Sequence, residues 1–105
     1  MEYHLAVNDI VGPSCLHGGK KAWDKQVWEM EVDREEGSVT LAYLSRDGEE
    51  GYPGDVIATV TYWVLEEGIR LGYQALCSKP TIINMTNHMY FNLGDSETIE
   101  GNQNM

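Results

Sequence analysis

Two histidines lie in segments whose composition suits chemistry on a small ligand. His17 is followed by two glycines in residues 12–19 (GPSCLHGG), and His88 lies in residues 87–93 (NHMYFNL). An imidazole both donates and accepts hydrogen bonds near neutral pH, and glycine backbone bends sharply and lets a ligand approach. Each histidine also has a plain structural interpretation, because loops carry such residues routinely. Residue types therefore indicate a candidate site without identifying its ligand.

The segment around His88 adds further polar groups among apolar residues. Asn87 contributes an amide and Tyr90 a phenol. Sugar sites use this combination, because each sugar hydroxyl both donates and accepts while the C–H face of the ring rests on an aromatic plane. The alternative is a strand end in which Asn87 caps a turn and Tyr90 fills the core. Both interpretations stay open on these residues alone.

Residues 47–55 (DGEEGYPGD) form an acid-rich stretch. Calcium binding is one chemistry to consider, but the stretch lacks the alternating Asp/Asn pattern and the terminal Glu of a calcium loop. Charge runs are usually exposed. We therefore expect a solvated acidic turn here.

Charge and cysteine usage narrow the function classes. Seventeen acidic residues against seven basic ones give the 105-residue chain a formal net charge of −10, which repels phosphate backbones and anionic lipid heads. Nucleic acid and membrane are thus poor partners, and a neutral small molecule fits better. Cys15 and Cys77 lack the spacing of a zinc site, so no metal site is predicted. No signal peptide or membrane span is recognised, which makes the cytoplasm the default location.

Alternating residue patterns predict β-strands along most of the chain. In residues 55–65 (DVIATVTYWVL) both alternating sets are largely apolar, as in a central strand that has lost its covering layer. Residues 66–68 (EEG) then predict a hairpin turn. Further strands are expected at residues 27–33, 38–44, 69–77 and 81–85. Short strands at near-regular spacing predict an all-β fold of mostly antiparallel strands, from a sandwich or barrel.

Taken together, the two histidine motifs resemble the aldose 1-epimerase family, which typically reads LHGG and then NHxYFNL. The stretch between them, including DGEEGYPGD, is similar to the family almost element by element, and the similarity covers residues 5–93. The resemblance implies a partial aldose 1-epimerase domain in residues 1–93, with part of a galactose mutarotase-like β-supersandwich. Residues 94–105 are polar and are expected to fray.

The resemblance also implies a reaction. The family interconverts the α and β anomers of free aldohexoses such as galactose and glucose, by opening and reclosing the ring, and needs no metal or organic cofactor. A glutamate takes the proton from the C1 hydroxyl while a histidine protonates the ring oxygen, and each such group contributes about 10²–10⁴-fold. His88 matches the general acid. The substrate-binding positions are matched by His17, which bonds the sugar, by Tyr90, which lines the pocket, and by Asn87, through the motif.

Three functional residues of the family have no counterpart in this sequence. The catalytic glutamate and a sugar-binding aspartate lie far downstream of NHxYFNL in the family, and a sugar-binding arginine lies upstream. Glu97 and Glu100 follow the motif too closely to replace the glutamate. We therefore expect little or no epimerase activity from the 105-residue chain.

The length of the chain leads to a further expectation. A sandwich of this type normally takes about 200–250 residues as one domain. A shorter chain is expected to expose strand edges and an apolar face, both of which favour self-association. Two other functions stay open, namely a non-catalytic carbohydrate-binding or interaction fragment and a chain with no function of its own. Saturable sugar binding that His88→Ala weakens would favour the binding fragment.

Overall fold

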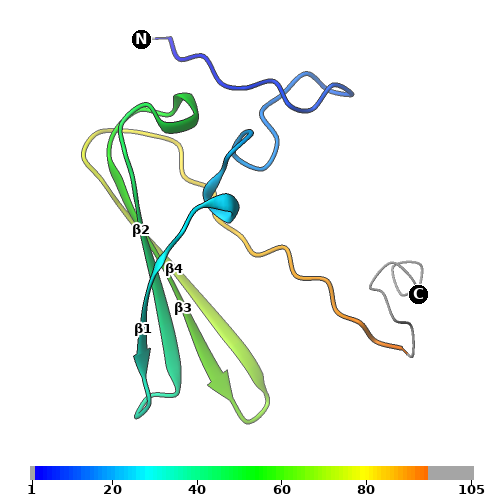
Figure 1. Ribbon diagram of the computed structural model, residues 1–105, viewed down its shortest axis with the longest axis vertical. Coiled ribbons are helices and arrows are strands. Elements are labelled where there is room, and N and C mark those ends of the chain that lie inside the picture. The colour runs from blue at the N-terminus through cyan, green and yellow to red at the C-terminus, as the bar shows by residue number, and fades with distance from the viewer. Residues whose placement is uncertain (1, 95–105) are drawn as a thin grey trace.

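The computed structural model describes residues 2–94, which form strands with almost no helix. Four strands make a single sheet, one short 3-10 helix precedes the first strand, and another lies between the second and third strands (Figure 1). The elements are η1 Trp23–Lys25, β1 Glu29–Asp33, β2 Ser38–Ser45, η2 Glu49–Gly51, β3 Val56–Leu65 and β4 Gly68–Cys77. The predicted all-β class is confirmed, and an antiparallel sheet of this kind is consistent with part of a β-sandwich.

The strands lie side by side in chain order, each antiparallel to the next. β3 therefore lies between β2 and β4, and a two-residue turn at Glu66 and Glu67 connects β3 to β4. β-branched and aromatic residues make up most of β3, and such residues pack well on a pleated surface. The predictions for β2, β3 and β4 are confirmed to within one residue at each end, whereas β1 begins two residues later than expected.

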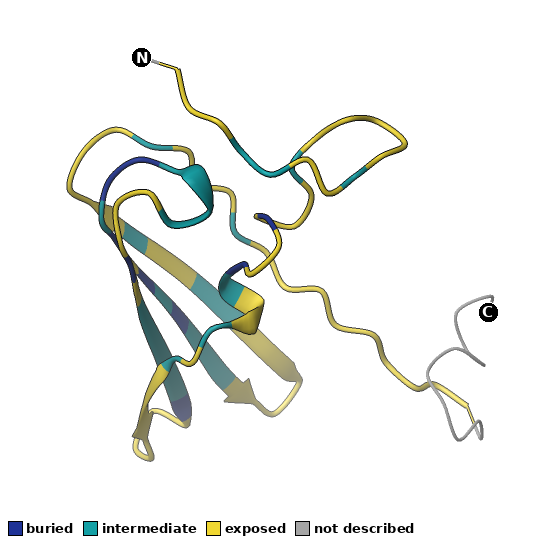
Figure 2. Ribbon diagram, turned by 45° about the horizontal axis from the view of Figure 1, so that its top comes forward, coloured by how far each residue is buried: buried dark blue, intermediate teal, exposed yellow. Residues whose placement is uncertain are grey.

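One face of the sheet carries a small hydrophobic core. Val56, Ala58 and Val60 alternate along β3 and are buried. Tyr43 and Leu41 of β2 are the registered partners of Ala58 and Val60, so they share this face. Figure 2 shows that exposed residues make up β1 and most of the chain after β4. The sheet is thus packed mainly along the first half of β3.

The opposite face of the sheet is more open. The guanidinium carbon of Arg70 lies 5.1 Å from the centre of the Trp63 ring, a cation–π contact across β3 and β4. Gly72 lies against the same indole, because a Cβ there would come within 2.9 Å of the ring. Ile57 is 48% exposed on this face. The prediction of a central strand with an uncovered apolar side is confirmed by this exposure and by the position of β3.

The two edges of the sheet differ in charge. All five residues of β1 are exposed, and three of them, Glu29, Glu31 and Asp33, are acidic. β4 forms the other edge and carries one charged residue, Arg70, among its ten. Charged side chains on an edge strand discourage pairing with another chain. The β1 edge is therefore better protected than the β4 edge.

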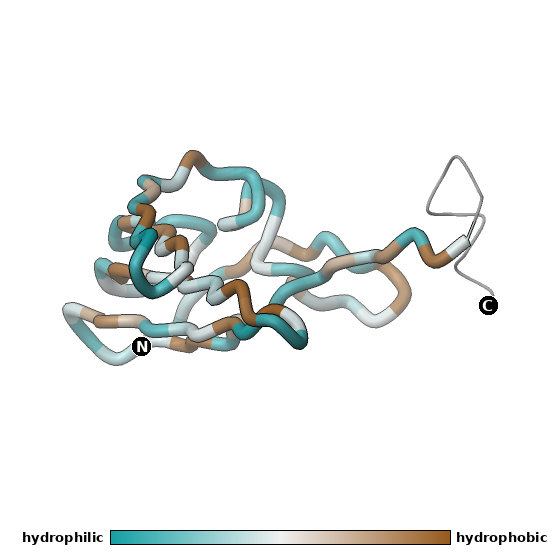
Figure 3. The backbone as a smooth tube through the Cα atoms, turned by 90° about the horizontal axis from the view of Figure 1, so that it is seen from below, coloured by the Kyte–Doolittle hydropathy of each residue, from teal (hydrophilic) through white to brown (hydrophobic). Residues whose placement is uncertain are grey.

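The strand predicted at residues 81–85 is wrong. From Pro80 to residue 93 the chain has no regular secondary structure, and Figure 3 shows its last part extending away from the sheet. Pro80 has no backbone N–H to donate, and a strand forms only where a neighbouring strand completes its hydrogen-bond ladder. No strand of the described chain pairs with these residues. The predicted fraying of residues 94–105 lies almost wholly outside the described residues.

The connection between β2 and β3 differs from the solvated acidic turn that the sequence predicted. Glu49 is half-buried, and its carboxylate accepts hydrogen bonds from the Tyr43 hydroxyl and from Ser45 Oγ, the latter at 2.7 Å. Both donors lie in the last three residues of β2, directly before the loop. This acidic side chain therefore stabilises the end of the strand instead of pointing into water.

Asp47 lies near the start of the same connection and bonds residues near its end. Its carboxylate accepts a hydrogen bond from the backbone amide of Gly54 at 2.5 Å and forms an ion pair with Lys79 Nζ at 3.2 Å. Its own amide donates to Asp55 Oδ1 at 2.8 Å. These contacts close the loop and attach the chain after β4 to it.

Replacing Tyr43 by phenylalanine tests the Glu49 contact through its pH dependence. Burial, the hydrogen bond to Glu49 and the charge of Glu49 raise the pKa of Tyr43 from 10.0 to about 12. The folded state thus holds the proton more tightly, so this contribution to stability is complete below pH 10 and is lost as the pH rises to about 12. We expect Tyr43→Phe to lower the free energy of unfolding by about 1 kcal/mol at neutral pH.

Urea unfolding at several alkaline pH values measures this difference. The loss of stability between pH 10.0 and about 12 should be smaller in Tyr43→Phe than in the unaltered chain. Tyr62→Phe is the matched control, because no partner for that hydroxyl is found among the described residues. Equal losses in the unaltered chain and in Tyr43→Phe would contradict the assignment.

Asp47→Ala tests the other end of the loop at acidic pH. The Gly54 amide, followed by Lys79, lowers the pKa of Asp47 below its ordinary 3.8. The contribution of Asp47 to stability is therefore present above pH 3.8 and is lost as the pH falls through the lower folded value. We expect a lower melting temperature for Asp47→Ala at neutral pH, with the gap closing in acid. Asp24→Ala is the control, since Asp24 pairs with its exposed neighbour Lys25, and a gap that persists in acid would rule the mechanism out.

Candidate functional site

His17 occupies a tight turn over residues 16–19. The amide of Gly19 donates to the carbonyl of Leu16 at 3.1 Å, and both central residues have positive φ, 55° at His17 and 84° at Gly18. Turns of this kind favour Gly, Asn or Asp, and the left-handed conformation costs other residues about 1–2 kcal/mol. The glycines after His17 thus serve the turn, while His17 itself is strained.

His88 lies in the irregular chain after β4, and its ring meets that of His17. The two ring centroids are 5.4 Å apart at an interplanar angle of 81°, an edge-to-face arrangement. The ring of His88 also contacts the ring of Tyr90, with a centroid distance of 5.2 Å and an interplanar angle of 55°. All three side chains belong to exposed residues. The structure therefore brings His17, His88 and Tyr90 into one solvent-accessible group, called the ring cluster below.

Asn87 turns toward the sheet and is not joined to the ring cluster. Its amide nitrogen lies 3.5 Å from the hydroxyl oxygen of Tyr73 in β4, and its Oδ1 accepts from the Met89 amide at 3.5 Å. These are long contacts, at the limit of hydrogen bonding. They place Asn87 between the sheet and the segment that carries His88. A sugar contact at Asn87 stays a prediction.

Three further aromatic rings lie together next to the core face. Trp28 and Tyr43 have ring centroids 5.5 Å apart, and Trp23 lies 6.3 Å from Trp28 and 6.4 Å from Tyr43. Trp28 Nε1 donates to the Trp23 carbonyl at 2.8 Å. Ala22, which precedes η1, is buried and lies against Gly18 of the His17 turn. The sequence analysis missed this cluster, although two tryptophans five residues apart were visible.

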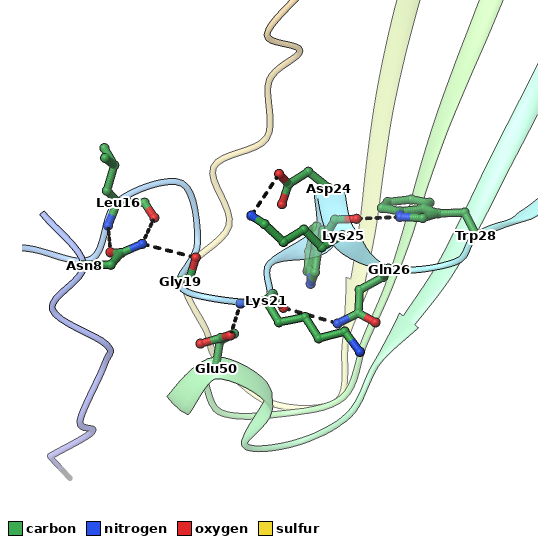
Figure 4. A network of polar contacts seen from close by, with 10 residues as sticks. Asn8, Leu16, Gly19, Lys21, Asp24, Lys25, Gln26, Trp28 and Glu50 are labelled. Atoms are coloured by element: carbon green, nitrogen blue, oxygen red, sulfur yellow. Dashed lines mark hydrogen bonds and ion pairs between the residues drawn. The ribbon is translucent and has the colours of Figure 1, made fainter.

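Two polar side chains hold the backbone around His17 (Figure 4). Asn8 Nδ2 donates to the carbonyls of Leu16 at 2.8 Å and Gly19 at 3.2 Å, and Asn8 Oδ1 accepts from the Leu16 amide at 2.6 Å. The Glu50 carboxylate, from the loop between β2 and β3, accepts from the Lys21 amide at 2.6 Å. The sequence analysis did not single out either residue, because contacts between a side chain and distant backbone have no spacing signature.

Tyr52 connects the same loop to the residue before Leu16. Its hydroxyl donates to Cys15 Sγ at 3.6 Å. The contact with Cys15, burial and the nearby charge of Glu50 together raise the pKa of Tyr52 above its ordinary value. The turn at His17 is therefore attached to the β2–β3 connection at two points, Glu50 and Tyr52.

An apolar cavity of about 460 Å³ opens elsewhere, and none of the predicted site residues lines it. It is lined by Tyr3, Leu5, Tyr52, Pro53, Pro80, Thr81 and Ile82. The cavity has no imidazole or carboxylate in its walls, whereas the ring cluster has two imidazoles. Of these two places, the ring cluster is the one that carries imidazoles, which can exchange protons near neutral pH.

No group of three or more His, Cys, Asp or Glu side chains in residues 2–94 is arranged to hold a metal ion. Within the same residues, neither imidazole of the ring cluster is hydrogen-bonded to a carboxylate. No helix in that part of the chain is long and apolar enough to cross a membrane.

Comparison with known proteins places the chain in a family. The model of a family described as Aldose 1-epimerase matches residues 1–105. The chain is 44% identical to human galactose mutarotase over 92 residues, which are 88% of this chain and 26% of that protein. It is 40% identical to aldose 1-epimerase of Escherichia coli (strain K12) over 88 residues, 83% of this chain and 25% of the relative. The chain thus spans about a quarter of the length of these curated relatives. It belongs to the aldose 1-epimerase family.

Proposed function

We propose that this chain binds a free aldohexose at the ring cluster and supplies the acid side of anomer interconversion. The observation that supports this most is the convergence of His17, His88 and Tyr90, at centroid distances of 5.4 and 5.2 Å, from segments far apart in the sequence. The relatives are named galactose mutarotase and aldose 1-epimerase, and a neutral sugar also suits a chain with a net charge of −10.

The roles follow from the chemistry of each group. His88 donates a proton to the ring oxygen of the sugar as the bond between C1 and that oxygen breaks, while a base takes the proton of the C1 hydroxyl. Rotation about the C1–C2 bond and reversal of both transfers give the other anomer. His17 hydrogen-bonds the sugar beside the ring oxygen, and the Tyr90 ring offers an aromatic face to its C–H groups.

The base is the part of this chemistry that the described residues do not supply. Glu49 is engaged with Tyr43 and Ser45, and Glu50 with the Lys21 amide. Without a carboxylate beside the imidazoles, no group in the described chain takes the proton of the C1 hydroxyl. We therefore propose that the 105-residue chain binds sugar with little or no turnover. The alternative is a carbohydrate-binding or interaction fragment that takes no part in catalysis.

Compartment and self-association complete the proposal. Cys15 and Cys77 are both free thiols, which suits a reducing compartment, so we propose the cytoplasm. Self-association is proposed at the β4 edge, since that edge carries a single charge and β1 carries three acids.

Sugar binding is tested by titrating ¹⁵N-labelled chain with D-galactose and following the amide signals by NMR. We expect saturable shifts, and affinities on the order of tenfold weaker for His88→Ala and for His17→Ala, because each loses a hydrogen bond to the sugar. His4→Ala is the matched control, since the third histidine is exposed and lies outside the ring cluster. Unsaturable shifts, or equal affinities in all three variants, would rule out binding at the ring cluster.

Turnover is tested by polarimetry of freshly dissolved α-D-galactose. We expect the purified chain to equilibrate the anomers no faster than buffer, because general acid catalysis without its base leaves the C1 proton in place. The His88→Ala chain run in parallel should behave in the same way. An acceleration that His88→Ala abolishes would mean that a complete site forms, and the proposed division between binding and turnover would then be wrong.

A further inference from the structure

The strained conformation of His17 needs an explanation within the structure. A residue other than glycine at a φ of 55° is uncommon. Such residues persist only where the surrounding contacts fix them, and they gather at functional sites. The contacts that fix this turn therefore decide where the imidazole lies.

Asn8 makes the most complete set of these contacts. Its side-chain amide bonds both backbone groups of Leu16, on one side of His17, and the carbonyl of Gly19 on the other. The donors and the acceptor of a carboxamide match one N–H and two carbonyls. No isosteric residue offers the same pattern, because aspartate at neutral pH cannot donate. Asn8 therefore holds both sides of the residue whose φ is unfavourable.

The backbone on either side of this contact is fixed as well. Asn8 comes directly before a short backbone pairing of Asp9 with Ser14, and its own amide donates to the Ser14 carbonyl at 3.2 Å. At the exit of the turn, Glu50 accepts from the Lys21 amide and lies so close to Gly19 that a Cβ there would collide with its carboxylate. Asn8 thus holds the turn on both sides of His17, and Glu50 adds a second contact at its exit (Figure 4).

We propose that Asn8 is a positioning residue, whose amide holds His17 in the left-handed turn that directs its imidazole to His88. This inference rests on the proposed function in one respect only, since the purpose of the alignment is to bind the sugar. The side chain of Asn8 bonds backbone atoms, and within the described residues it forms no hydrogen bond with either imidazole. Its effect on sugar binding is therefore transmitted through the turn.

Side-chain NMR of the full chain tests this without any sugar. The C–H signals of His4, His17 and His88 are assigned with the three single alanine variants, and the cross-peak between the His17 and His88 rings reports their contact. Two replacements are compared. Asn8→Ala removes all three bonds, whereas Asn8→Asp keeps the acceptor for the Leu16 amide and turns a carboxylate toward two carbonyl oxygens. Asn84→Ala is the control, because Asn84 is exposed and bonds no described residue.

We expect both Asn8 variants to lose the ring cross-peak and to shift the His17 and His88 signals, with His4 and the amides of β2 to β4 unchanged. D-galactose affinity should fall about tenfold. Asn84→Ala should change none of these. If Asn8→Ala does not fold, Asn8→Asp decides, because it keeps the size of the side chain and one of its bonds.

Two outcomes separate this inference from the proposed function. A ring cross-peak that survives in Asn8→Asp, in a chain with an intact sheet, would overturn the positioning role even if the unaltered chain binds galactose. Loss of the cross-peak in a chain that never bound galactose would support the positioning role and would remove the proposed function.

Discussion

The hydrogen-bond ladders on either side of β3 are the constraint on which the rest of the structure depends. β3 pairs with β2 over eight residues and with β4 over ten, and Ala58, in the first half of β3, is fully buried. Because the strands are antiparallel, the end of β2, the start of β3 and the end of β4 meet at one end of the sheet, where Ser45, Val56 and Cys77 are in register. Both segments that carry the candidate histidines are attached at this end.

The attachment is different for each histidine. The His17 turn is held by Glu50, from the loop that joins β2 to β3. The His88 segment begins where β4 ends, and there Ser78 exchanges hydrogen bonds with Asp55 at 2.8 and 2.9 Å. The two imidazoles meet because two loops of the same end of the sheet hold them, not because their own segments form regular structure. The relative position of the two imidazoles therefore depends on hydrogen bonds between side chains and backbone.

Sequence patterns predicted the four strands and the turn between β3 and β4, but not the structure of the β2–β3 loop or of the chain after β4. The alternation of apolar and polar residues predicted β2, β3 and β4, because successive side chains of a strand point to opposite faces of the sheet. The strand predicted from the residue pattern at residues 81–85 was wrong. Such a pattern shows which face of a strand would be apolar, but it cannot show whether a neighbouring strand is there to pair with it. The acidic loop was misjudged for a similar reason. The sequence shows that Glu49 is charged, but only the folded chain shows that Tyr43 and Ser45 donate hydrogen bonds to it.

The candidate site could be predicted only in part. His17, His88 and Tyr90 were found through motifs, and their meeting in space required the folded chain. Asn8 was missed because its side chain bonds backbone atoms of Leu16, eight residues away. Every residue has these backbone atoms, so no residue type in the sequence marks the contact.

The unequal edges of the sheet limit how large an assembly can become. Two sheets joined antiparallel at their β4 edges would each contribute β1 as an outermost strand, and β1 presents Glu29, Glu31 and Asp33. A second such pair would expose only its own β1 edges, so like charges would meet where two pairs approached each other. Growth would therefore stop at a closed pair, whereas two pairing-competent edges on each copy would allow an open-ended fibre.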